Sequence, residues 1–150
     1  MFLLFIVSNF GALGLGVLLM SNGSTSDWYY SLNKAPWTPD GWVFGTAWFS
    51  LMFSYAFYMT ALVLKYKRPN FKLVKLYVIQ WILHVSWPYI FFNQHLTIFG
   101  LIVIIGLWLL IGYFTFRFMK TLKYQTLFIL PYLVWMTVAT SLNAYIVINN

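Results

Sequence analysis

The side chains that could carry out chemistry in this sequence are few: two acids, two histidines and no cysteine. Asp27 and Asp40 are the acids, so a mechanism with two carboxylates would need both of these residues. His84 falls in the middle of an apolar segment and His95 falls between two such segments, so they are poorly placed to share a metal ion. No nucleophile–base constellation is present, which argues against hydrolase or transferase chemistry. We expect no metal site, no required cofactor and a protein that binds a ligand.

One helical face within residues 76–94 carries the most informative pattern. Its four members lie at positions i, i+4, i+7 and i+11, which places them on the same side of a helix. A polar side chain inside a membrane faces the protein interior or a wet cavity, because lipid offers it no hydrogen-bond partner. Pro88 also lacks the N–H that would bond the carbonyl of His84. Two interpretations stay open, a hydrogen-bonded clamp between helices and the polar edge of a ligand pocket. The four residues are Gln80, His84, Trp87 and Phe91.

The stretch from Lys34 to Trp48 holds two prolines, two glycines and three tryptophans in fifteen residues. Pro36 and Pro39 fix φ and favour extended geometry before them, so residues 34–40 should be ordered but not helical. The indole rings are typical of a membrane interface, where the ring is buried and its N–H stays wet. A second interpretation is that this rigid loop folds back over a cavity between helices and forms its lid.

Composition places these residues in a membrane protein. Hydrophobic residues make up 62% of the chain and charged residues 7%, whereas soluble domains contain roughly a quarter charged residues. The mean hydropathy is +0.79. We therefore predict an all-α integral membrane fold, a single domain that is a bundle of five transmembrane helices with an ordered loop at 21–41. Pro131 is expected to kink the last span. The predicted spans cover residues 2–20, 42–64, 76–94, 96–116 and 124–148.

The charge distribution predicts an orientation in the cell membrane. The net charge is +7, and eight of the nine basic residues lie between the second and third spans or between the fourth and fifth. These short clusters are typical of the cytoplasmic side of a membrane and not of a nucleic-acid interface, so no nucleic acid is expected as a partner. With five spans the N-terminus is then cytoplasmic, and the C-terminus and loop 21–41 are outside. The first span begins apolar, without the basic region of a cleaved signal.

Three motifs occur in order along the chain, and together they resemble a known family. The first reads Trp28-Tyr29-x-x-Leu32-x-Lys34, Pro36-Trp37-x-Pro39 and Phe44-Gly45-x-x-Trp48, the second Gln80-x-x-x-His84-x-x-Trp87-Pro88-x-x-Phe91-Phe92, and the third Pro131-Tyr132-x-x-Trp135-x-x-x-Ala139-Thr140-x-Leu142-Asn143. They are similar to the translocator protein family, also called tryptophan-rich sensory proteins or peripheral-type benzodiazepine receptors. The resemblance covers essentially the whole chain.

The resemblance implies a five-helix bundle, usually a homodimer, with a pocket closed by the first loop. It implies binding of porphyrins such as protoporphyrin IX and of benzodiazepine or isoquinoline ligands, in tetrapyrrole sensing, transport or homeostasis. Two alternatives are light-dependent porphyrin degradation, with Trp48 and Trp135 as the photochemical residues, and a small lipid or solute carrier. Residues matching the family by position, together with neighbours on the same faces, give the predicted ligand-binding set: Tyr29, Lys34, Trp48, Met52, Tyr55, Gln80, His84, Trp87, Phe91, Trp135, Ala139 and Leu142.

The chain departs from the family pattern at two positions that bear on the pocket. Position 84 is usually Asn in the family and is His here. An imidazole could lie near a porphyrin metal or simply replace one hydrogen-bonding side chain by another, and the second interpretation is favoured. Val103 stands where many members have an Asp, so any role of that acid is absent.

Overall fold

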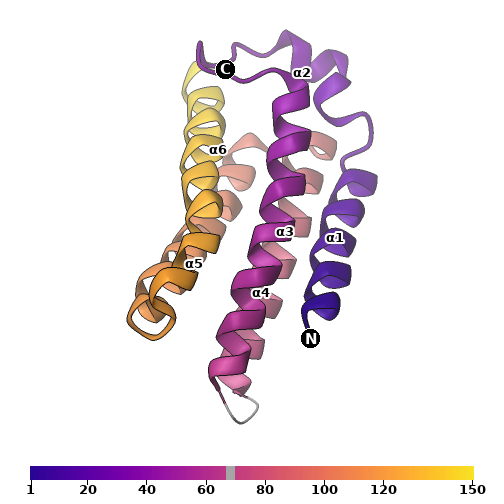
Figure 1. Cartoon of the computed structure of the whole chain (residues 1–150). Coiled ribbons are helices and arrows are strands. Elements are labelled where there is room, and N and C mark those ends of the chain that lie inside the picture. Colours follow the sequence, from indigo (N-terminus) through magenta and orange to yellow (C-terminus); the bar gives the residue numbers. More distant parts are fainter. Residues whose placement is uncertain (67–69) are drawn as a thin grey trace.

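The computed structural model describes residues 1–66 and 70–150 and forms a bundle of five long helices joined by shorter helical segments (Figure 1). No β-strand occurs in these two ranges. Of the short segments, η1 and η3 are 3₁₀-helices and η2 is a π-helix. The elements are α1 (Phe2–Leu19), η1 (Gly23–Thr25), α2 (Asp27–Ser31), α3 (Gly41–Lys65), α4 (Phe71–Pro88), η2 (Tyr89–Asn93), α5 (Thr97–Leu122), η3 (Lys123–Phe128) and α6 (Leu130–Asn149).

The long helices run along one common direction, and the two termini lie at opposite ends of the bundle (Figure 1). Helix α1 packs against α3 and α4, α5 packs against α4 and α6, and α3 contacts both α5 and α6. Four helical segments, all but α4, are by length and composition apolar enough to cross a membrane. Helix α4 has 18 residues, among them Lys72, Lys75, Gln80 and His84, and these polar side chains lower its mean hydropathy.

Helix α4 begins at Phe71, five residues before the predicted start of the third span at residue 76. Asn70 explains the earlier start, because its side chain accepts a hydrogen bond from the N–H of Leu73 at 3.3 Å and caps the helix. The α-helical geometry ends at Pro88, and the helix continues as the π-helix η2. In it the N–H of Gln94 donates to the carbonyl of Tyr89, five residues back, at 3.0 Å.

The connection between the last two long helices also differs from the expectation. Helix α5 continues to Leu122, so Arg117 and Lys120 lie in its last turns and not in a loop. Helix α6 begins at Leu130, and residues 123–128 form a separate 3₁₀ segment. Pro131 therefore lies in the first turn of α6, where the missing N–H removes no helical hydrogen bond. The sequence predicted a kink inside the last span, but Pro131 is the second residue of α6 and lies at its start.

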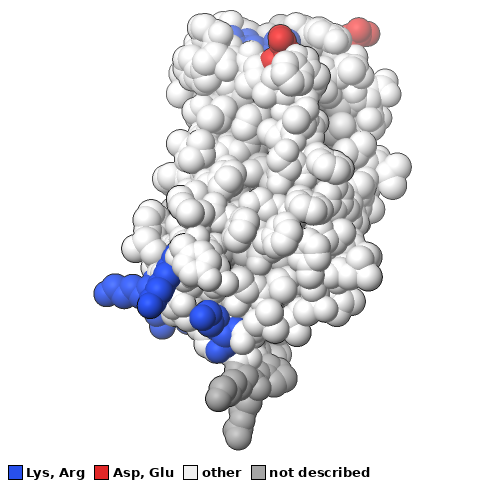
Figure 2. Space-filling model, in the orientation of Figure 1, with Lys and Arg blue, Asp and Glu red and all other residues white. Residues whose placement is uncertain are grey.

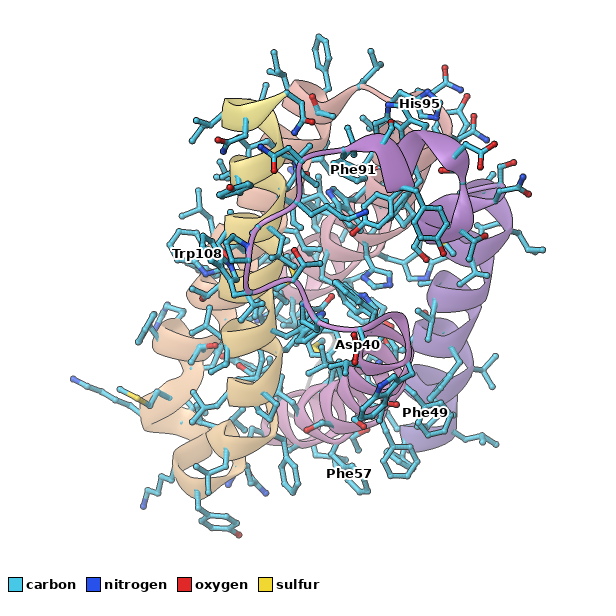
Figure 3. All side chains as sticks on the ribbon, turned by 90° about the horizontal axis from the view of Figure 1, so that it is seen from above. Asp40, Phe49, Phe57, Phe91, His95 and Trp108 are labelled. Carbon is cyan, nitrogen blue, oxygen red and sulfur yellow. The ribbon has the colours of Figure 1, made fainter. Side chains whose placement is uncertain are left out.

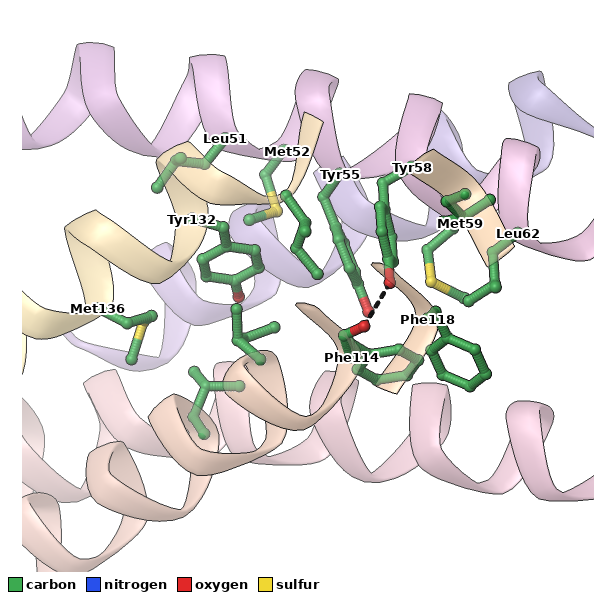
Figure 4. Close-up of a cluster of buried hydrophobic side chains, with 14 of the residues drawn as sticks. Leu51, Met52, Tyr55, Tyr58, Met59, Leu62, Phe114, Phe118, Tyr132 and Met136 are labelled. Atoms are coloured by element: carbon green, nitrogen blue, oxygen red, sulfur yellow. Dashed lines mark hydrogen bonds between the residues drawn. The ribbon is translucent and has the colours of Figure 1, made fainter. Parts of the chain in front are cut away.

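The half of the bundle that holds the end of α3, the start of α4 and the connection from α5 to α6 is filled by large side chains (Figure 4). Tyr55, Tyr58 and Phe114 are fully buried, and the hydroxyl of Tyr58 donates to the carbonyl of Phe114 at 2.7 Å. Met52 and Tyr132 complete this core toward the middle of the bundle. The cavity described below lies in the other half of the bundle.

Charged residues separate to the two ends of the bundle (Figure 2). One end carries lysine and arginine side chains at the end of α3, the start of α4 and the end of α5. The opposite end carries both acids, Asp27 and Asp40, together with Lys34. Two members of the basic cluster, Lys67 and Arg68, lie outside the described residues. The side of the membrane on which each end lies stays a prediction.

Candidate ligand-binding site

A cavity of about 320 Å³ lies inside the bundle, next to loop 21–41. Helices α1 and α4 line it with their C-terminal halves, α6 with its middle and C-terminal part, and α3 and α5 with their N-terminal halves. These parts of the helices meet at the end of the bundle that carries the loop. Ser24, Tyr29 and Gly41, at or next to the loop, line the cavity on that side.

His84 and Trp48 form the inner end of the cavity. Their rings lie at 74° with centroids 4.9 Å apart, an edge-to-face arrangement. Behind His84, and away from the cavity, Gln80 Nε2 donates to the hydroxyl of Tyr132 at 3.0 Å, and that hydroxyl lies 3.3 Å from His84 Nδ1. The side chains of Gln80, Tyr132 and His84, which form this hydrogen-bond chain, are all buried. A polar group deep in the bundle is thus paired, as membrane interiors require.

The wall formed by α4 and η2 is aromatic, and the side-chain amide of Asn143 links it to α6. The rings of Trp87 and Phe91 stack at 16° with centroids 5.4 Å apart. Trp87 Nε1 donates to Asn143 Oδ1 at 3.1 Å, and Asn143 Nδ2 donates to the carbonyl of Thr97 at 3.0 Å. A Cβ at Gly100 would lie 3.2 Å from Phe91 Cβ and 3.3 Å from Asn143 Oδ1, so glycine is what allows α5 to approach this closely.

The loop between α2 and α3 crosses the end of the bundle as far as α6 and then returns to α3 (Figure 3). Side-chain hydrogen bonds hold it there. The N–H of Asn33 donates to Asn150 Oδ1 at 2.8 Å, and Asn150 Nδ2 donates to the carbonyl of Asn33 at 3.2 Å. Trp37 Nε1 donates to Ser141 Oγ at 3.1 Å. The loop is therefore latched to α6 by these hydrogen bonds and by an edge-to-face contact between the rings of Trp37 and Tyr145, whose centroids lie 5.5 Å apart.

Tyr29 and Lys34 form the rim of the cavity. Lys34 Nζ donates to the carbonyl of Tyr29 at 2.9 Å and lies 4.6 Å from the centre of the Tyr29 ring. Burial raises the pKa of the Tyr29 hydroxyl, which therefore stays protonated at neutral pH. The ammonium group of Lys34 is held by neutral groups and not by a carboxylate, so it is free to exchange them for an anion.

Seven members of the predicted ligand-binding set line this cavity. The other five do not: Met52 and Tyr55 lie deeper in the core, Gln80 lies behind His84, and Lys34 lies at the rim. Trp135 lies behind Trp48, with ring centroids 6.4 Å apart at 85°. The seven lining residues are Tyr29, Trp48, His84, Trp87, Phe91, Ala139 and Leu142.

Helix α1 supplies part of the wall that the sequence did not indicate. Leu13, Gly16 and Val17 line the cavity, and none of them is in the predicted ligand-binding set. Gly16 also allows close packing, because a Cβ there would lie 3.3 Å from Pro88 Cγ. Nothing in the spacing distinguished these residues, since the whole span is apolar. No group of three or more acidic or histidine side chains that could hold a metal ion occurs within the described residues.

Comparison with known proteins agrees with this architecture. The sequence model of the TspO/MBR family matches residues 3–148. The chain is 30% identical over 117 residues to the tryptophan-rich sensory protein of Cereibacter sphaeroides, covering 78% of this chain and 73% of that protein. It is 32% identical over 141 residues to the tryptophan-rich protein TspO of Chlorobaculum tepidum, covering 87% and 88%. It is 31% identical over 123 residues to the protein CrtK of Rhodobacter capsulatus, covering 80% and 76%.

These matches confirm the family resemblance and the fold class that the sequence predicted. The fifth crossing is α4, whose His84 lines the cavity and whose Gln80 lies in the hydrogen-bonded group behind it. The chain belongs to the TspO/MBR family, the tryptophan-rich sensory proteins, and is a multi-pass membrane protein built as a bundle of five helices.

Proposed function

We propose that the protein binds a flat, largely apolar ligand in the cavity between its helices, with porphyrins as the first candidates, and serves tetrapyrrole sensing, transport or homeostasis. The observation that carries this proposal is the arrangement of aromatic rings around one cavity between the helices. Trp48 stands at the inner end, and the stacked pair Trp87 and Phe91 forms a wall. Aromatic walls with a few polar groups are typical of sites for planar apolar ligands.

The volume of the cavity bears on which ligand fits. At about 320 Å³ it lies near the lower end of the range of roughly 300–1,000 Å³ for ligand pockets. A ligand of two or three fused rings, such as a benzodiazepine or an isoquinoline, suits this volume. A tetrapyrrole needs more room, and the latched loop is the element whose displacement would provide it. In that event Lys34 would leave the carbonyl of Tyr29 and pair with a propionate at the rim.

A second candidate function is light-dependent degradation of a bound porphyrin. One observation favours it: Trp48 touches the cavity, and Trp135 stands directly behind it at a centroid distance of 6.4 Å. Two adjacent indoles can pass an electron toward a photo-excited ligand. The two functions are separated by whether porphyrin absorbance persists in the dark and falls under light.

The test of binding is to fill the cavity. Ala139 lines the cavity on α6, so Ala139→Phe places a ring in the space that the ligand would occupy. Val134 lies on the same helix with 64% of its surface exposed, so Val134→Phe is the matched control. Protoporphyrin IX is titrated into each purified protein in detergent and followed by fluorescence in the dark. We expect the control to bind as the wild type does and Ala139→Phe to lose binding while melting at a similar temperature. Unchanged binding in Ala139→Phe would contradict the proposal.

A further inference from the structure

We propose that the hydrogen-bond chain Gln80–Tyr132–His84 holds His84 as the tautomer protonated on Nε2, with that N–H directed into the cavity. The site then anchors its ligand through an acceptor atom of the ligand, such as a carbonyl or carboxylate oxygen, and His84 does not coordinate the metal of a metalloporphyrin. The tautomer stands on the contacts alone, whereas the ligand preference rests on the function proposed above.

The tautomer follows from counting donors along the chain. Gln80 Nε2 donates to the Tyr132 hydroxyl at 3.0 Å, so the oxygen of Tyr132 is an acceptor in this contact. Its single hydrogen is left for His84 Nδ1, which lies 3.3 Å away. A neutral imidazole has one N–H and one acceptor nitrogen. Because Nδ1 accepts, Nε2 carries the hydrogen.

His84 is neutral in this arrangement. The only acids of the sequence, Asp27 and Asp40, lie at the end of the bundle outside the long helices, so no carboxylate stands beside the imidazole. A charged side chain in the middle of a membrane span is strongly disfavoured unless it is paired. His84 is 5% exposed and is surrounded by neutral partners.

The Nε2 edge of the ring is the one that opens to the cavity. His84 lines the cavity, whereas Tyr132 and Gln80 lie behind it and do not. Within the described residues His84 Nε2 has no hydrogen-bond partner. The nitrogen is nevertheless not fully buried, so part of its surface is accessible. An unpaired N–H thus faces an apolar space, where a ligand acceptor would complete it.

The same geometry argues against metal coordination by this residue. A metal ion binds the lone pair of a ring nitrogen, and the hydrogen on Nε2 occupies that position. Coordination would require the whole chain to reverse, with the amide of Gln80 turned so that its oxygen accepts from Tyr132 and Tyr132 accepts from Nδ1–H. The residue that replaces the family's usual Asn at position 84 is therefore a hydrogen-bond donor in the cavity.

The tautomer is tested without any ligand. Protein labelled with ¹⁵N in its histidines is purified in detergent, and a His95→Gln variant assigns the two imidazoles by NMR. We expect His84 to be protonated on Nε2 and Tyr132→Phe, which removes the donor to Nδ1, to mix the two tautomers. Tyr58→Phe, which removes a tyrosine hydroxyl in the filled half of the bundle, is the matched control and should leave His84 unchanged. A Nδ1–H tautomer or a charged imidazole in the wild type would overturn the inference.

The ligand preference is tested with free-base and iron protoporphyrin IX. His84→Leu should weaken free-base binding by roughly 2- to 10-fold, the loss of one hydrogen bond. Its acceptor in this ligand is a ring nitrogen that carries no hydrogen, because both propionates lie on the edge of the macrocycle that faces Lys34 at the rim. The absorption spectrum of the iron form should be the same in wild type and His84→Leu, because no histidine ligand is lost. A spectrum of histidine-coordinated iron that disappears in His84→Leu would overturn the inference and leave the proposed function standing. If neither porphyrin binds the wild type, the proposed function fails, and the NMR result still decides the tautomer.

Discussion

Replacing Trp48 separates stacking from photochemistry at the cavity. Trp48→Phe keeps an aromatic face toward the ligand and removes the easily oxidised indole. Trp48→Ala removes the face altogether, together with edge-to-face contacts to His84 at 4.9 Å and Trp135 at 6.4 Å. Stacking of a flat heterocycle on one aromatic side chain is worth about 1–3 kcal/mol. Trp48→Ala should therefore weaken porphyrin binding by roughly 5- to 150-fold, whereas Trp48→Phe should keep most of the affinity.

Both readouts come from one sample. Porphyrin is titrated by fluorescence in the dark, and its absorbance is then followed under constant light. Trp108→Phe is the control, because Trp108 does not line the cavity and its Nε1 donates to Thr137 Oγ1 at 3.0 Å elsewhere on the bundle. If Trp48 acts as a photochemical donor, Trp48→Phe binds in the dark but no longer loses porphyrin in the light. Equal affinity and equal light reactivity in wild type and Trp48→Ala would refute the placement of the ligand in this cavity.

The remaining predictions concern orientation, the loop and close packing. A reporter fused after Asn150 should appear outside the cell and one inserted at residues 69–70 inside; detection of both on the same side would refute the five-span orientation. Trp37→Phe keeps the ring but removes the 3.1 Å hydrogen bond to α6, so stopped-flow mixing should show ligand association and dissociation both faster by roughly 2- to 10-fold; unchanged rates would mean that the loop is not the gate. Gly100→Ala should cost about 1–3 kcal/mol of unfolding free energy, whereas Gly14→Ala, whose added Cβ meets nothing within 4 Å, should cost none; equal losses in denaturation would contradict the close approach of α5.

Helical periodicity predicted correctly which face of a helix turns toward the cavity, but not which residues along that face reach it. His84, Trp87 and Phe91 share a helical face, and that face does turn toward the cavity. Met52 and Tyr55 share a face with Trp48 for the same reason, yet they lie farther along α3, where the core is filled. A period of 3.6 residues states on which side of a helix a residue lies, but not whether the neighbouring helices leave a space at that level.

Residues without a distinguishing chemical mark could not be found from the sequence. Leu13 and Val17 line the cavity from a span that is apolar all round, so no residue in it stands out. The boundary at Pro131 was ambiguous because proline both kinks a helix and starts one, and the choice depends on where the preceding turn ends. The sequence could not predict where the Lys34 side chain points, because this depends on how the loop folds. The folded loop brings the carbonyl of Tyr29 within hydrogen-bond reach of Lys34 Nζ.

The π-helix from Tyr89 to Asn93 has a consequence for the length of the chain. A π-turn holds one residue more than an α-turn, so it rotates the flanking segments relative to each other by about 100°. It acts as an insertion of one residue between Trp87 and His95. The ring of Trp87 stacks on Phe91, and the ring of His95 stacks on Trp28 with centroids 4.1 Å apart. Deleting a single residue here would restore α-helical geometry and separate one of these two stacks. A relative that continues as an α-helix through this point would be one residue shorter between its counterparts of Trp87 and Gly100.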